Sequence, residues 1–427
     1  MTPIQTESID KIAIIQWLEL QKQLLYIQKN SKFYQRLFKI HDIDVSEIKT
    51  AKDLKRIPVT TKEDLQQYNE DFLCVPREDI IDHVTTSGTL GNPVNFFFNE
   101  ADLERLAINE MQSFNMAGIT KVDKVQITTT LDRRFIAGMA YFLGLRKLGA
   151  GIIRTGSGLP NLQWDSIERF KPNYLVAVPS FLLKMLEYAV LNGIDYKNCS
   201  VKAAICIGEP LRDQNFELNA LGKKIIELWD IELFSTYAST EMATAFTECE
   251  QHTGNHIQPE LVYTEVLDEF GEPVKMGEIG ELVVTTLQVQ TMPLLRFATG
   301  DMVSYTNDIC KCGRNTLRLS PVLGRKQQHI KYKGTSLYPQ QIIDVLIDFS
   351  AISNFVVIVE KDDSEMDRLL VKISNSLSQL EQERLNQHFQ THLRVIPKIE
   401  IVSNSEIDSL KNPIGSRKPA LFLDLRN

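Results

Sequence analysis

The segment from Thr85 to Pro93 joins hydroxyl side chains to Gly88 and Gly91 and ends in a proline. Glycines let backbone N–H groups approach an anion closely, and hydroxyls add uncharged donors, so this composition is suited to binding phosphate groups. The segment is not a Walker loop, because no Gly-Lys-Ser/Thr follows it. Taken alone, it is equally compatible with a surface turn between two strands.

Three further segments follow in a fixed order and supply acidic and basic groups. They run from Ser235 to Ala243, from Leu294 to Asp301 and from Leu323 to Gly334, and the basic run Ser416-Arg417-Lys418-Pro419 lies near the end. Taken alone, a glutamate such as Glu241 is most simply a solvent-exposed surface acid. Asp301 is likewise compatible with an ordinary turn aspartate in its "TGD" bend.

This order of motifs resembles the adenylate-forming superfamily, and within it the phenylacetate–CoA ligase family. The narrower resemblance rests on Gly208 to Leu211, the "MPLLRFATGD" run that ends at Asp301, "CKCGR" and "SLYPQQI", and it extends from about Leu20 to the C-terminus. It implies an AMP-forming ligase. Such an enzyme activates a carboxylic acid, here an aryl or arylacetic acid, with ATP to an acyl-adenylate, and then transfers the acyl group to a thiol, with CoA as the default.

The resemblance also implies a set of residues that bind ATP. Thr240 would contact the α-phosphate and Glu241 would hold Mg²⁺, while Asp301 and Arg325 would close on the ribose. The phosphate loop would contribute Thr86, Ser87, Gly88, Thr89 and Gly91, and the adenine side would contribute Gly208, Glu209, Pro210, Tyr237, Ala238 and Ser239. Leu90 stands where the family commonly has a threonine, so one hydroxyl donor is missing.

Lys418 matches the lysine that bridges the attacking carboxylate and the α-phosphate in this family. A lysine suits that role as a mobile point charge among anions. Arg417 stands where the family has a glycine, and Lys411 is the alternative lysine. In the family the small C-terminal domain that carries this lysine swings between two poses, and Gln327 occupies the hinge position, which is usually Asp or Lys.

The acid pocket has the weakest sequence signal. By resemblance it is lined by Phe135, Tyr141 and Phe142, together with Gly208 and Ser235. Aromatic walls would fit a flat aryl or arylacetic acid. The same aromatic residues are equally compatible with an ordinary hydrophobic core.

Three cysteines and a histidine form a separate group. Cys249, His256, Cys310 and Cys312 supply three thiolates and one imidazole, a closed donor set typical of structural Zn²⁺. Some relatives within the phenylacetate–CoA ligase family carry the same pattern. His252 competes with His256 for the fourth position, and the alternative is that the cysteines are unrelated buried residues, as we expect for Cys74, Cys199 and Cys206.

The pattern of elements predicts an α/β fold. Residues 10–42 read as helical, and a hydroxyl residue at the start of the segment 59–65 predicts a second helix. Apolar strands alternate with amphipathic helices up to residue 235, which favours a parallel sheet, and an antiparallel, strand-rich part follows residue 257. We expect a large N-terminal domain over residues 1–323 and a small mobile α+β domain over residues 324–427, with the boundary placed mainly by the resemblance.

The composition of the 427 residues is that of an ordinary globular protein. A net charge of −8 predicts no nucleic-acid partner, and no apolar run is long enough to predict a membrane span. Six cysteines without a secretion signal favour the cytoplasm. A homodimer is left open.

Four other functions stay compatible with the sequence. The adenylate could be passed to a carrier-protein phosphopantetheine or to an amine, although the net negative charge disfavours an acidic carrier. The acyl group could be passed to a partner protein. The departures at Leu90, Gln327 and Arg417 would also fit a nucleotide-binding relative that has lost turnover.

Overall fold

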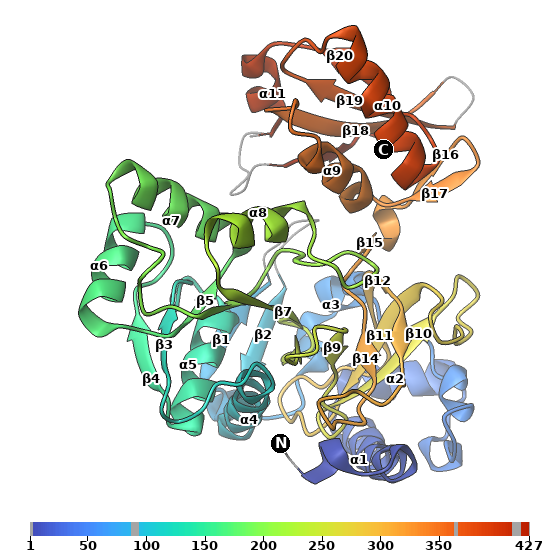
Figure 1. Ribbon diagram of the computed structural model, residues 1–427. Helices are drawn as coiled ribbons and strands as arrows, with labels where there is room; N and C mark the ends of the chain where they lie inside the picture. The colour runs from blue at the N-terminus through green and yellow to red at the C-terminus, as the bar shows by residue number, and fades with distance from the viewer. Residues whose placement is uncertain (1–2, 87–93, 363–365, 412–419, 427) are drawn as a thin grey trace. The chain divides into compact units, whose positions relative to one another are not determined.

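The computed structural model describes residues 3–86, 94–362, 366–411 and 420–426. The chain forms two compact units. Unit 1 comprises Met1–Leu218, Gly222–Thr299 and Val303–Pro321, and unit 2 comprises Asn219–Leu221, Gly300–Met302 and Val322–Asn427. Figure 1 shows the elements of both units. Among the described residues, no helix is both long and apolar enough to cross a membrane.

Unit 1 begins with the two helices α1 (Ile9–Asn30) and α2 (Lys32–Ile40). The prediction of helix over 10–42 is confirmed, except that Ser31 divides it. The N–H of Ser31 closes α1 on the Ile27 carbonyl, and its hydroxyl accepts from the N–H of Tyr34 to begin α2. The helix predicted near residue 60 is α3 (Lys62–Gln67), which begins with a capping box formed by Thr61 and Asp64. Single 3₁₀ turns lie at η1 (Pro3–Thr6), η2 (Val45–Glu47), η3 (Asp53–Arg56), η4 (Asn69–Phe72) and η5 (Arg77–Asp79).

The centre of unit 1 is a nine-stranded sheet in the order β13-β14-β9-β8-β7-β6-β5-β3-β4. Its parallel half contains β3 (Lys124–Ile127), β4 (Gly151–Arg154), β5 (Tyr174–Ala177), β6 (Ala203–Cys206) and the first half of β7 (Glu232–Ser239). Both β5 and β6 are buried along their whole length, as expected for a parallel sheet with helices on both faces. The predicted parallel α/β arrangement is therefore confirmed.

Helices pack against this parallel half from both sides. Helices α4 (Glu100–Met116) and α5 (Ile136–Leu148) share a core with β3, β5 and β6. Helix α6 (Pro160–Phe170) lies over the other face, where its Gln163 bonds Gln126 of β3, and it packs on α7 (Pro179–Leu191). Helix α8 covers Ala220–Leu228.

The antiparallel half of the sheet contains β8 (Thr244–Glu248), β9 (Asn255–His256), β14 (Arg318–Leu319) and β13 (Tyr305–Thr306). Strand β7 is the point of change, because Ser235 pairs in parallel with Cys206 of β6 and Thr236 pairs antiparallel with Thr247 of β8. A second antiparallel sheet contains β10 (Val262–Leu267), β11 (Gly280–Thr286) and β12 (Phe297–Val303). The predicted antiparallel part is thus confirmed, although it begins at β8.

Unit 2 is an α+β unit, as predicted. Its sheet has the order β20-β19-β18-β21, with β18 (Phe355–Lys361), β19 (Asp367–Ile373), β20 (Lys398–Ile401) and β21 (Phe422–Asp424). Alternate residues of β18 face opposite ways: Val357 and Val359 belong to a core with α9 (Pro339–Asp348) and α10 (Gln379–Leu393), whereas Val356 and Ile358 pack with Ile407 of α11 (Asn404–Lys411). The unit also contains β15 (Gly324–Arg325), η6 (Lys326–Gln328), and the hairpin of β16 (Ile330–Tyr332) and β17 (Thr335–Leu337).

Candidate active site and metal centre

The predicted nucleotide segments lie where two neighbouring parallel strands end. Residues Gly208 to Pro210 follow β6, and Tyr237 to Thr240 follow the parallel part of β7. The carboxyl ends of strands are where open α/β sheets bind ligands. Gly208 has φ +73 with open space around it, so a side chain there would be strained by the backbone and not by crowding.

The carboxylate of Glu209 is held by a neighbouring helix. It accepts the N–H of Ser180 at 2.8 Å and the Ser180 hydroxyl at 2.7 Å, in the first turn of α7. A carboxylate at this end of a helix satisfies free N–H groups and the positive end of the helix dipole. Glu209 therefore fixes the path of the segment after β6 relative to α7, a contact that the motif alone did not predict.

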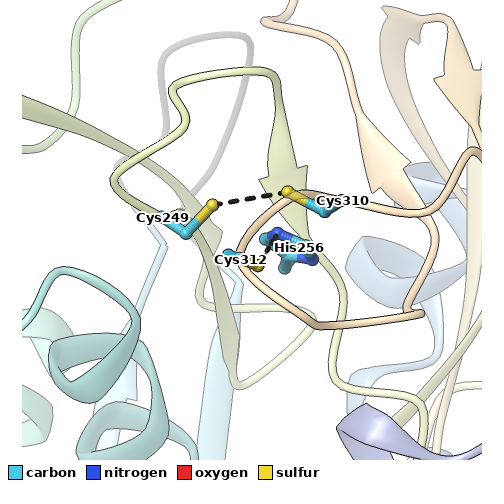
Figure 2. A group of neighbouring side chains, drawn as sticks. All are labelled: Cys249, His256, Cys310 and Cys312. Atoms are coloured by element: carbon cyan, nitrogen blue, oxygen red, sulfur yellow. Dashed lines mark hydrogen bonds between the residues drawn. The ribbon is translucent and has the colours of Figure 1, made fainter.

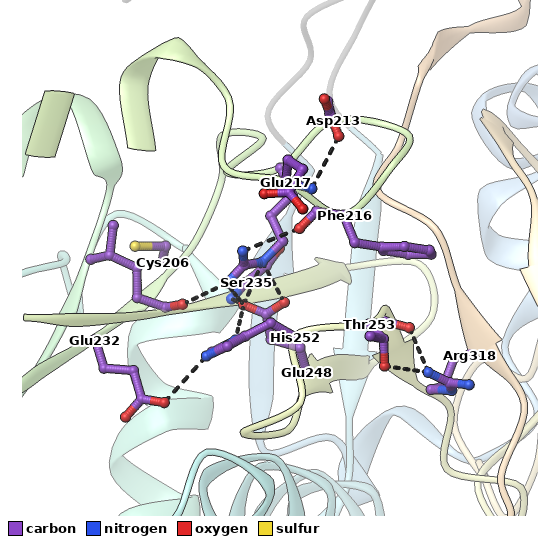
Figure 3. A network of polar contacts seen from close by, with 12 residues as sticks. Cys206, Asp213, Phe216, Glu217, Glu232, Ser235, Glu248, His252, Thr253 and Arg318 are labelled. Carbon is purple, nitrogen blue, oxygen red and sulfur yellow. Dashed lines mark hydrogen bonds and ion pairs between the residues drawn. The ribbon is translucent and has the colours of Figure 1, made fainter. Parts of the chain in front are cut away.

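Ser235 lies at the point where β7 changes from parallel to antiparallel pairing. Its N–H donates to the carboxylate of Glu248 at 2.5 Å, and Glu248 is only 1 % exposed (Figure 3). Arg212, four residues after Gly208, forms an ion pair with the same carboxylate at 2.8 Å and donates to the carbonyls of Phe216 and Leu233. A buried ion pair thus ties the segment after β6 to the strand that carries Ser235.

Arg105 of α4 anchors the turn that contains Thr240 and Glu241, through contacts with the last residue of this turn and the residue after it. Its guanidinium donates to the Ala243 carbonyl at 2.7 Å and to the Thr244 hydroxyl at 3.1 Å, and also to the carbonyls of Leu261 and Leu287. Arg105 is 4 % exposed, and burial lowers its pKa to about 10. Thr240 and Glu241 themselves are half-buried, so both can reach a ligand.

The base of the predicted phosphate loop is closed by Thr86. The hydroxyl of Thr86 accepts the N–H of Val94 at 3.0 Å, and the Thr86 N–H donates to the Val94 carbonyl. Ser87, Gly88, Thr89 and Gly91, as well as Leu90, lie outside the described residues. Beside this base, the N–H of Thr85 donates to the carbonyl of Arg134, next to Phe135. The structure therefore brings the loop base next to the start of the segment predicted to line the acid pocket.

The three aromatic residues predicted for the acid pocket have different surroundings. Phe135 is exposed at the start of α5, and Phe142 is half-buried beneath the guanidinium of Arg154. Tyr141 is 3 % exposed and packs edge-on against Phe114 in the core shared with α4. Tyr141 thus has the environment of a core residue, and only the other two present part of a ring outside the core.

Asp301 and Arg325 face one another across an antiparallel strand pair in unit 2. Their residues are direct partners in the register of β12 and β15, and Arg325 Nε lies 2.8 Å from the Asp301 carboxylate. Asp301 is 5 % exposed, while Arg325 is exposed. The pair predicted to close on a ribose is therefore preassembled within one unit. Lys418 lies outside the described residues, whereas Lys411 donates to Asn354 and lies over the Phe355 ring.

The four predicted metal ligands form one cluster, with their ligand atoms all within 4.8 Å of one another (Figure 2). Cys249 Sγ lies 3.7 Å from Cys310 Sγ, and Cys312 Sγ lies 3.5 Å from His256 Nε2. A sulfur–sulfur distance of 3.7 Å is too long for a disulfide. In a tetrahedral zinc site with ordinary bond lengths, two sulfurs lie about 3.8 Å apart and a sulfur and a nitrogen about 3.6 Å apart. The donor set and its spacing therefore fit Zn²⁺.

His256 presents Nε2 to the cysteines and bonds the Thr316 hydroxyl through Nδ1 at 2.8 Å. Such a contact fixes the orientation of a ligand imidazole. Burial, with the charges of Arg314 and Arg318, lowers the pKa of His256 to about 3, which keeps the imidazole neutral and able to bind a metal. His252, the alternative ligand, lies away from the cluster between Glu232 and Glu248, at 3.2 Å from each.

Comparisons with known proteins agree with this architecture. The family model described as "AMP-binding enzyme" matches residues 17–292, and "AMP-binding enzyme C-terminal domain" matches residues 334–420. The phenylacetate-coenzyme A ligase of Thermus thermophilus is 28% identical over 378 residues, which cover 87% of this chain and 83% of the relative. The phenylacetate-coenzyme A ligase of Escherichia coli (strain K12) is 26% identical and covers 100% of this chain and 98% of the relative.

A solved structure of 2-hydroxyisobutyryl-CoA ligase, in the postadenylation state, shares the fold with a TM-score of 0.83. The two sequences are 23% identical, and the match covers 99% of this chain and 91% of that one. Since the first family model covers more than half of the sequence, the chain belongs to the AMP-binding enzyme family.

Proposed function

We propose that this protein is an AMP-forming ligase that activates an aryl or arylacetic acid with ATP and transfers the acyl group to CoA. The observation that carries the proposal is the convergence of Gly208–Pro210 and Tyr237–Glu241 at adjacent strand ends in a chain of the AMP-binding enzyme family. The phenylacetate-coenzyme A ligases among its relatives support an arylacetic acid as the substrate and CoA as the acyl acceptor.

In this mechanism the protein acts by position and charge. Thr240 would contact the α-phosphate, and the loop of Thr86 to Gly91 would hold the outer phosphates while pyrophosphate departs. Glu241 would hold Mg²⁺, which would offset the negative charge of the phosphates. The backbone from Gly208 to Pro210 lies along the adenine. Asp301 accepts the ribose hydroxyls, and Arg325, already paired with Asp301, closes on the same sugar.

Lys418 completes the adenylation site as the cation between the acid carboxylate and the α-phosphate. It belongs to the C-terminal domain, residues 324–427, which we propose moves relative to residues 1–323 between the two half-reactions. Phe135, Phe142 and Ser235 contact the acid, and Tyr141 supports them from the core.

We also assign the cluster of Cys249, His256, Cys310 and Cys312 to a structural Zn²⁺. Four protein ligands leave no open position for a substrate, so the metal would crosslink the loop after β8 to the loop after β13 and take no part in the chemistry. A reducing compartment such as the cytoplasm, which we propose for this protein, would keep these thiols free to bind metal.

The test is acid-dependent ATP–pyrophosphate exchange, without CoA, across aromatic, arylacetic and aliphatic acids. Exchange with aromatic or arylacetic acids, followed by CoA thioester formation, is the expected result. Exchange without turnover of CoA would redirect the proposal to a carrier-protein or amine acceptor, and ATP binding without exchange for any acid would refute ligase activity. Metal analysis of purified protein should find about one zinc per chain.

A further inference from the structure

Two buried arginines lie beside the cysteine cluster. Arg314 is 4 % exposed and belongs to the same short loop as Cys310 and Cys312. Arg318 is 6 % exposed, and in the register of β9 and β14 it is the direct partner of His256. One arginine therefore lies two residues from a ligand in sequence, and the other lies opposite a ligand across a strand pair.

Neither guanidinium has a carboxylate partner among the described residues. Arg314 Nε donates to the amide oxygen of Gln5 at 3.1 Å. Arg318 donates to the carbonyl of Thr253 at 2.8 Å and to the Thr253 hydroxyl (Figure 3). It also donates to the carbonyl of Asp308 at 3.1 Å. All these acceptors are neutral. Burying a cation without an anion is costly, so two such residues in one place call for a compensating negative charge.

The cysteine cluster is the group that can supply this charge. Arg318 also has a buried Nε with no hydrogen-bond partner among the described residues, so it has an unused donor in this environment. Three thiolates around Zn²⁺ carry one net negative charge, whereas three neutral thiols without metal carry none.

We infer that Arg314 and Arg318 are the counter-ions of an anionic tris-cysteine, mono-histidine metal centre and set its affinity for Zn²⁺. This inference rests on the metal centre proposed above and adds to it two residues that are not ligands. The two buried positive charges offset the net negative charge of the zinc-bound cluster. In the metal-free protein the two arginines have no anion beside them among the described residues. Metal binding supplies one and so lowers the free-energy cost of burying the two positive charges.

The inference is tested by measuring Zn²⁺ affinity in competition with a chromophoric chelator, on folded protein, for the wild type and for R318Q, R314Q and R318K. The glutamine variants should bind Zn²⁺ roughly 10–100-fold more weakly, the range seen when groups just outside a metal's ligands are lost. R318K keeps the charge but loses the fork-shaped contacts with Thr253 and Asp308, so it should stay close to the wild type.

Lys311 provides a matched control, because it lies between Cys310 and Cys312 in sequence but is exposed. K311Q should change the affinity by no more than about twofold, since solvent screens its charge. Equal weakening of R318K and R318Q would show that Arg318 acts only through its contacts and would overturn the inference. If R318Q fails to fold, the Zn²⁺ affinity of R314Q tests in the same way whether a buried positive charge strengthens metal binding.

Two further outcomes separate the inference from the metal centre on which it rests. A wild-type protein that binds no Zn²⁺ in the competition assay would overturn the metal centre, and the counter-ions with it. A wild-type protein that binds Zn²⁺ tightly, with R314Q and R318Q equally tight, would leave the metal centre in place and overturn the counter-ions alone.

Discussion

Arg212 and Glu248 form an ion pair with 2.8 Å between Nε and Oε2, and both side chains are less than one-tenth exposed. Arg212 directly follows the motif Gly208 to Leu211, and Glu248 directly precedes the metal-ligand candidate Cys249. Because Glu248 also accepts the N–H of Ser235, the contact links three features that are separate in sequence: the segment after β6, the centre of β7 and the cysteine cluster.

Removing one partner of this pair should be strongly destabilising. E248Q leaves Arg212 buried without an anion, and we expect a loss of about 3–5 kcal/mol in the free energy of unfolding. The control is D165N, which breaks the exposed Asp165–Arg169 pair and should cost less than about 1 kcal/mol. Chemical denaturation measures both, and equal effects of E248Q and D165N would contradict the role of the buried pair.

A double variant separates stability from positioning. In R212M/E248L both charges are replaced by apolar groups, which can restore much of the stability lost in E248Q. The carboxylate that accepts the N–H of Ser235 is then lost, so pyrophosphate exchange should stay roughly 10–100-fold below wild type. Recovery of exchange together with stability would show that the pair only holds the fold.

Arg105 should control how the turn of Thr240 and Glu241 binds Mg²⁺. R105K keeps a positive charge, but one ammonium group cannot replace a guanidinium that donates to four separate acceptors. We expect R105K to need more Mg²⁺ for half-maximal pyrophosphate exchange, as E241Q should. E104Q, which changes the exposed neighbour of Arg105 on α4, is the control. A wild-type Mg²⁺ titration for R105K would rule out this anchoring role.

Much of the fold could be predicted because the sequence carries local signals for it. The short apolar runs of β5 and β6 and the hydroxyl cap of α3 depend on neighbouring residues alone. The residues that hold the site segments in place could not be predicted. Arg105 contacts Ala243, 138 positions away, and in sequence it resembles any cation on an amphipathic helix.

The metal cluster shows the same limit. Spacing alone left His252 and His256 as alternatives, and only the pairing of β9 with β14 brings His256 to the cysteines. The left-handed turn at His252, with φ +51, directs that side chain to Glu232 and Glu248 instead. The choice between the two histidines therefore depends on strand register, which the sequence pattern did not reveal.

Lys418 and Lys411 should respond differently to removal. K418A should reduce adenylation far more than thioester formation from supplied acyl-adenylate, because its proposed partners are the carboxylate and the α-phosphate. Lys411 is held by Asn354 and the Phe355 ring, so K411A should lower the stability of its unit and leave the ratio of the two half-reactions unchanged. Equal losses in both half-reactions for K418A would remove it from the adenylation step.

Glu110 should make the stability of the protein depend on pH. It lies on α4 against α5, where Gly144 permits close approach, since a Cβ at that glycine would come within 2.3 Å of Glu110 Cβ. Burial raises the pKa of Glu110 from 4.5 to about 8. A carboxyl with a raised pKa binds more protons in the folded state between these two values, so folded stability falls as the pH rises from about 4.5 to about 8.

E110Q removes this titration and keeps the shape of the side chain. The stability of E110Q relative to wild type should therefore increase between pH 5 and pH 8, by on the order of 3 kcal/mol. Denaturation of both proteins at the two pH values measures the difference, and titrations shared by both proteins cancel in it. A difference that does not change with pH would mean that Glu110 is ionised in the folded protein, with a cation or water compensating its charge.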